Sequence, residues 1–336
     1  MNIEDIEGRI EKIRSNWNTD SKDKGDALFA LAKKHIDDAL IYRCVSFARE
    51  EYERARLEGD TECLCNLAHC YYVLAFFSYK TQCLKEAREY HLKSIETHIE
   101  GSRNRKYQDE DFFRFYSVTD EKAADSILST IMLSSPQVFN DPVDCPIVQE
   151  NSEKFFFPDK TVFDGLKVCC FGQENLDKKN ETPFYKDAKK WAYYGDKHKG
   201  ICVRYHFFPN ELEKVLSDHF VFSPVKYEPG FSFDRGIVAD GLLRKSKEYS
   251  EEDEWRIVWF DRDYKSNKFY NAERDCIFVP IDICNIISIY VGYRCPDNIV
   301  AKVMEFAAKK KETLLSVYRI QPDPNNLFRM IETPLN

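Results

Sequence analysis

Glycine is scarce in this sequence, with only 12 glycines among 336 residues. This scarcity argues against a glycine-rich phosphate-binding loop as the main functional element of the protein. Positive charge is not in excess either, because 49 Lys and Arg face 57 Asp and Glu and leave a net charge of −8. The sequence therefore predicts no broad basic surface of the kind that nucleic-acid binding uses.

Metal-binding cysteine pairs and long apolar runs are also missing. None of the 12 cysteines forms a Cys-x-x-Cys pair, and neither Cys63-x-Cys65 nor Cys169-Cys170 has the spacing of zinc ligands. No apolar run approaches the ~20 residues of a membrane span, and the opening residues MNIEDIEGRI contain no apolar signal segment. We therefore expect a cytoplasmic protein with reduced thiols, no membrane contact and no metal.

The amino-acid composition and the pattern of apolar residues change about one third of the way along the chain. Residues 1–101 contain no proline and few glycines, which is typical of a helical region. Residues 102–110 are polar and predict a linker, whereas 111–320 alternate short apolar runs with turn residues. Residues 321–336 are rich in proline and asparagine and predict a loosely ordered tail. The length suits two domains.

Apolar residues in the first region recur at helical spacing, as in Leu28, Leu31 and His35. Leu31-Ala32 returns as Leu67-Ala68, which suggests a repeat of about 36 residues. This pattern resembles tetratricopeptide repeats, although an unrelated helical bundle remains an alternative. Because two helix pairs bury little surface alone, we expect the region to pack on the rest of the chain or to dock a protein partner.

The second region predicts a mixed α+β domain, because its strands and helices follow no regular alternation. Apolar or alternating runs predict strands at 112–116, 130–134, 166–171, 200–207, 220–227, 254–260, 276–280, 286–291 and 314–320. Amphipathic spacing and capping residues predict helices at 120–129, 183–195, 209–217, 236–248 and 298–311.

Four segments of this domain combine polar and aromatic side chains, and we expect them to form one nucleotide site. They are residues 111–144, 168–171, 189–200 and 251–260. In the first, Arg114 and Tyr116 share one face of a strand, where an arginine suits a bidentate contact with an anion. A buried ion pair is the alternative role for this arginine.

Turn and aromatic residues supply the other candidate ligand contacts. Asn140 and Asp141 stand before a proline, in a turn that can form the lip of a pocket. Trp191, Tyr193 and Tyr194 end a helix and can stack on a base or a nicotinamide ring. Simple turn formation and core packing are the alternatives for these two groups.

An acidic run opens a late strand. Glu252 and Glu254 share a face at period two, with Arg256 in line. Because the neighbouring carboxylates repel one another, we expect the pKa of at least one to rise, which makes an acid, a base or an electrostatic stabiliser available. A solvated acidic turn is the alternative.

Several of these motifs occur in one order that resembles a bacterial family, the domain of unknown function 2971. They are FRFY at 113–116, IMLSSPQVFNDPVD at 131–144, CCF at 169–171, WAYYG with KGICV at 191–203, VKY at 225–227 and DEWRIV at 253–258. Gly172 stands where that family has serine, and Lys190 where it has methionine. The family itself implies no activity.

The layout also resembles that of ADP-ribosyltransferases, with an arginine strand, a helix, a strand, a tyrosine pocket and a late E-x-E strand. This resemblance implies an NAD-consuming enzyme in which Arg114 contacts NAD, Tyr193 or Tyr194 stacks on nicotinamide, and Glu254 is catalytic beside Glu252. A bacterial toxin or an anti-phage abortive-infection effector would fit this activity. No clear Ser-Thr-Ser follows the arginine strand, which departs from the pattern.

Two other functions remain open at this point. The same pocket could belong to a non-catalytic module that binds a nucleotide or a protein. Alternatively, Asp141, Asp144, Glu252 and Glu254 could serve a metal-dependent nuclease, because two-metal sites use clustered carboxylates. The net charge and the lack of an ordered lysine beside the acids weaken the nuclease interpretation.

Overall fold

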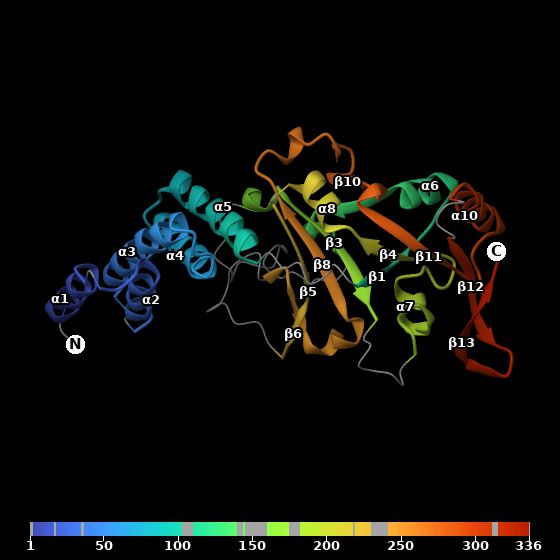
Figure 1. Ribbon diagram of the computed structural model, residues 1–336, viewed down its shortest axis with the longest axis horizontal. Coiled ribbons are helices and arrows are strands. Elements are labelled where there is room, and N and C mark those ends of the chain that lie inside the picture. The colour runs from blue at the N-terminus through green and yellow to red at the C-terminus, as the bar shows by residue number, and fades with distance from the viewer. Residues whose placement is uncertain are drawn as a thin grey trace.

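The computed structural model describes residues 3–335, except 17, 35–36, 103–109, 140–143, 145–159, 175–181, 218, 230–240 and 311–314. Within these residues a helical region precedes a domain built on one large mixed sheet, so the chain is α+β, as the sequence predicts. The N-terminal helical region lies at one end of an elongated molecule, and the C-terminal strands lie near the other (Figure 1). Nearly all of the predicted linker falls outside the described residues.

Five helices form the N-terminal region, and each packs on the next one along the chain. They are α1 (Ile3–Arg14), α2 (Ser21–Ala32), α3 (Asp38–Leu57), α4 (Leu64–Lys80) and α5 (Leu84–Gly101). Asp20 and Asp37 begin α2 and α3, because each side chain accepts a hydrogen bond from a free amide of the first turn. Gly59, with φ +93°, follows the end of α3. The predicted apolar stripes supply the core of this region.

Eleven strands of the described residues form the large sheet, in the order β13-β12-β11-β4-β1-β3-β2-β10-β9, and β8 joins it through β3 and carries β5. Only β11 and β12 pair in parallel among the described strand pairs of this sheet. The strands are β1 (Asp111–Tyr116), β2 (Thr130–Ser134), β3 (Leu166–Gln173), β4 (Ile201–Phe207), β5 (Phe220–Pro224), β8 (Glu254–Phe260), β9 (Tyr270–Asn271), β10 (Cys276–Pro280), β11 (Cys284–Gly292), β12 (Ser316–Asp323) and β13 (Asn326–Pro334).

Helices and a small second sheet complete the domain. The helices are α6 (Glu121–Ser129), α7 (Ala188–Tyr193), α8 (Pro209–Leu216) and α10 (Asp297–Lys309). Asp120 caps α6 by accepting a hydrogen bond from the backbone of Ala123 at 2.8 Å. Strands β6 (Lys226–Glu228) and β7 (Arg244–Ser246) pair in parallel, and a 3-10 helix, Lys247–Glu252, leads from β7 to β8.

Helix α5 joins the helical region to the sheet. Its Leu92 and Ile95 share an apolar cluster with side chains of β3, β5 and β8. At the edge of this contact, Arg262 donates four hydrogen bonds of 2.6–3.0 Å to Glu89 and Glu96 of α5. The helical region therefore packs on the rest of the chain, which is one of the two outcomes expected from its small size.

The structure corrects two local predictions. The predicted tail contains β13, which pairs with β12, and its Met330 is buried beside Ile320. The proline and asparagine residues between these strands form the hairpin turn. The predicted helix at 236–248 is wrong for residues 244–248, because β7 and the 3-10 helix occupy residues 244–252. Sheet pairing there overrides local propensity.

Among the described helices, none is both long enough and apolar enough to cross a membrane.

Candidate functional site

A pocket of about 350 Å³ brings the four predicted segments together. Strands β1 and β3 supply Phe113 and Cys170 to its wall, and β8 supplies Glu254. Lys190 of α7 and Ser134 of β2 also line it. Segments far apart in the sequence therefore meet at one cavity, as the sequence predicts, because the sheet places β1, β3 and β8 side by side.

The register of these strands fixes which side chains share the pocket face. Phe113 lies opposite Gly172, and Gly172 lies opposite Glu254, so the three positions form a row across β1, β3 and β8. Residues directly opposite one another in a sheet point to the same face. The ring of Phe184 covers Gly172 and stacks on Phe113 with a centroid distance of 5.5 Å. One side of the pocket is therefore aromatic.

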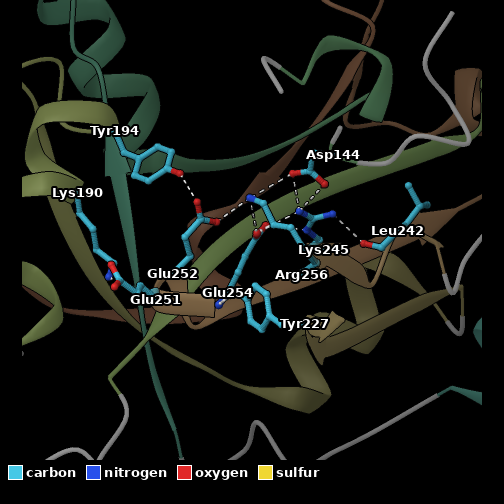
Figure 2. Close-up of polar contacts among 10 residues, drawn as sticks. All are labelled: Asp144, Lys190, Tyr194, Tyr227, Leu242, Lys245, Glu251, Glu252, Glu254 and Arg256. Carbon is cyan, nitrogen blue, oxygen red and sulfur yellow. Dashed lines mark hydrogen bonds and ion pairs between the residues drawn. The ribbon is translucent and has the colours of Figure 1, made fainter. Parts of the chain in front are cut away.

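Charged side chains form the other side of the pocket (Figure 2). Arg256, which is fully buried, donates to Glu254 at 2.6 and 3.1 Å and to Asp144 at 2.7 and 2.8 Å. Its third nitrogen donates to the carbonyl of Leu242 at 2.9 Å. This geometry holds both carboxylates through one guanidinium, which explains how charged groups remain buried here.

Lys245 connects the carboxylates of Glu254 and Asp144 to a third carboxylate, that of Glu252. Its ammonium lies 2.6 Å from Glu252, 3.3 Å from Glu254 and 3.5 Å from Asp144. Tyr194 donates to the other oxygen of Glu252 at 2.6 Å, so Glu252 is held from two sides (Figure 2). The network therefore runs without a break from β8 through β7 to the end of α7.

The charges in this network oppose the expected rise in a carboxylate pKa. Burial alone would raise the pKa of Glu254, but Arg256 and Lys245 outweigh burial and lower the pKa to about 2. Burial would lower the pKa of Lys245, but Glu254 and Asp144 raise it above its ordinary value. The prediction of a raised pKa is therefore wrong for Glu254, because two cations lie within contact of it.

Arg114 is placed differently from the prediction. The alternation along β1 is confirmed, but Phe113 and not Arg114 shares the face of Glu254. Arg114 borders the pocket, yet its guanidinium donates to the carbonyl of Met132 and to the thiol of Cys169. The register with β3 decides the face, and the sequence of one strand does not contain this information.

The other candidates divide between pocket, core and surface. Tyr116 bonds through its hydroxyl to Tyr205 at 2.8 Å, on the opposite face. Trp191 is fully buried and donates to the carbonyl of Tyr185, which is the core role that the sequence left open. Tyr193 is 80% exposed and does not line the pocket.

Two candidates lie outside the described residues, and one important residue was missed. Asn140 and Asp141 belong to the part of the chain that the structure does not describe. Lys245 was missed because it lies in a segment predicted to be helical, and the cluster of Arg244, Lys245 and Lys247 before the acidic run was the available signal. Among the described residues, no three His, Cys, Asp or Glu side chains are grouped to hold a metal.

Comparison of the chain with models of known protein families, with curated proteins and with solved structures found no match.

Proposed function

We propose that the pocket binds NAD or a closely related nucleotide and breaks the bond between its nicotinamide ring and its ribose. The observation that carries this proposal is the pair of carboxylates, Glu252 and Glu254, facing a pocket with an aromatic wall. The low pKa of Glu254 keeps it ionised at neutral pH. An aromatic wall beside ionised carboxylates suits a flat, positively charged ring such as nicotinamide.

The chemistry follows from the charge that develops on the sugar. The carbon–nitrogen bond breaks with its electron pair on the nicotinamide nitrogen, which leaves as a neutral molecule. Positive charge then develops at the ribose carbon, and preorganised carboxylates stabilise it. An acceptor nucleophile forms the new bond to that carbon and gives up a proton. Glu252 is the better candidate for direct contact, because its side chain is 19% exposed whereas that of Glu254 is 8% exposed.

Strand order gives further support by analogy with ADP-ribosyltransferases. The arginine strand β1 and the E-x-E strand β8 flank a single strand, β3. The analogy is weakened at Arg114, whose guanidinium is engaged elsewhere, so a nucleotide phosphate would compete with Glu252 for Lys245 or with Asp187 for Lys190. Membership of the family of unknown function 2971 is part of this proposal.

The setting we propose is a bacterial cytoplasm, where reduced cysteines are usual. A toxin or an anti-phage abortive-infection effector would use NAD consumption in this way. Because α5 packs on the sheet, a protein partner of the helical region would dock on α1–α4.

The test is NAD consumption by the purified protein, with cell lysate offered as the source of acceptor. The variants are Glu252→Gln and Glu254→Gln, which remove charge and keep shape. Glu251→Gln is the matched control, because the side chain of Glu251 is 75% exposed and pairs with Lys189 outside the pocket. We expect turnover in the wild type and in the control, and its loss by at least about 100-fold in the two pocket variants.

Other outcomes separate the remaining functions. If NAD raises the melting temperature without turnover, the pocket belongs to a binding module. Cleavage of nucleic acid that requires a divalent metal would support the alternative of a metal-dependent nuclease. If NAD neither turns over nor changes the melting temperature, the proposal is wrong.

A further inference from the structure

Exposed aromatic side chains gather next to the pocket, on the surface around α7. Nine large apolar side chains are exposed among the described residues, and four of these lie here: Val138, Tyr193, Tyr194 and Tyr293. Val138 and Tyr194 line the pocket itself. The ring of Tyr293 packs against the ring of His198 at a centroid distance of 5.0 Å, which places Tyr293 on the same surface. Single exposed apolar residues are ordinary, but a local cluster indicates an interaction site.

Positive charge lies on the same surface. Lys197, Lys199 and Arg294 are exposed, and the backbone of Arg294 donates to the carbonyl of His198 at 3.1 Å, so Arg294 lies beside the turn that carries both lysines. No carboxylate of the described residues forms an ion pair with Lys197, Lys199 or Arg294 within 4.0 Å. A local group of available cations is notable in a chain whose net charge is −8.

The backbone holds these side chains in an unusual conformation. Asp196, Lys197 and His198 have φ values of 47°, 54° and 68°, so three consecutive residues other than glycine are left-handed. Such residues are strained and persist where the surroundings enforce them. His198 is fixed by a bond from its backbone to the carbonyl of Trp191 and by its ring, which lies nearly parallel to that of Trp191. These contacts therefore hold the turn at residues 196–198 in one conformation.

We propose that single-stranded nucleic acid docks on this surface, with phosphates at Lys197, Lys199 and Arg294 and a base against Tyr193. Exposed aromatic rings beside cations are the pattern by which proteins hold single strands without reading their sequence. A double helix would offer phosphates but keep its bases stacked inside. The bound strand passes the mouth of the pocket, because Tyr194 and Lys190 of the same segment line that pocket.

The test is fluorescence anisotropy with a labelled single-stranded DNA of about 15 nucleotides and mixed sequence, and with the matching RNA and duplex DNA. The assay contains no NAD, so its outcome is independent of the proposed NAD cleavage. We expect the wild type to bind the single strand, to bind it more weakly as salt rises, and to prefer it to the duplex.

Variants locate the binding on this surface. We expect the combined K197A, K199A and R294A variant to bind about tenfold more weakly or worse, and Tyr193→Ala to bind about fivefold more weakly. A variant with K265A, K268A and R274A, three exposed cations between β8 and β10, removes the same charge and should bind like the wild type. Absence of binding, equal binding of duplex, or equal weakening in both triple variants would overturn the proposal.

Discussion

The ring of Phe184 lies directly against the backbone of Gly172, where an added Cβ atom would come within 1.8 Å of the ring. Gly172 lies between Phe113 and Glu254 in the row across β1, β3 and β8. The aromatic wall of the pocket therefore depends on the absence of a side chain at position 172.

Replacing Gly172 with serine should displace Phe184 from this wall. We expect the free energy of unfolding to fall by about 1–3 kcal/mol, because overpacking a dense core forces side chains to shift. Urea unfolding measures this change. Gly8→Ala is the control, because nothing lies within 4 Å of its added Cβ atom. A Gly172→Ser protein as stable as the wild type would show that Phe184 moves without cost.

Replacing Arg256 with methionine should destabilise the protein by about 3–5 kcal/mol. The loss follows because the carboxylates of Glu254 and Asp144, each 8% exposed, would remain buried without the guanidinium. The control is Arg43→Met, whose pair with Glu7 is exposed on both sides and should contribute less than about 1 kcal/mol. If adding Glu254→Gln to Arg256→Met recovers no stability, buried charge is not the cause.

The stability of the protein in acid should depend on Glu254. Its pKa of about 2 lies below the ordinary value of 4.5, so its ionised form stabilises the fold fully above pH 4.5. This contribution is lost as the pH falls through the folded pKa. The difference in unfolding free energy between the wild type and Glu254→Gln should therefore shrink between pH 4.5 and pH 2. Parallel curves for the two proteins would contradict the low pKa.

The contact of α5 with the sheet should depend partly on Arg262. Replacing Arg262 with alanine removes its bonds to Glu89 and Glu96, and we expect a loss of about 1 kcal/mol, since these side chains are partly exposed. A double-mutant cycle with Glu96→Gln measures the coupling. Additive losses in the cycle would mean that this ion pair contributes nothing to the interface.

Local signals in the sequence were sufficient for most elements. The capping aspartate before α6 and the apolar runs of β2, β8 and β10 fixed those elements, because capping and alternation act within a few residues. Strand β13 escaped prediction, although its partner β12 was expected at 314–320, because proline and asparagine in the turn between them resemble a disordered end.

The sequence by itself determined the α+β class, the break between helices and sheet, and the four segments that meet at the pocket. Only the tertiary structure decided that Phe113 shares the face of Glu254 while Arg114 does not, since the register between β1 and β3 sets the face. It also decided that Glu254 is ionised, because Lys245 and Arg256 lie beside it. Ionisation depends on distances between charges, and the order of residues along the chain does not contain those distances.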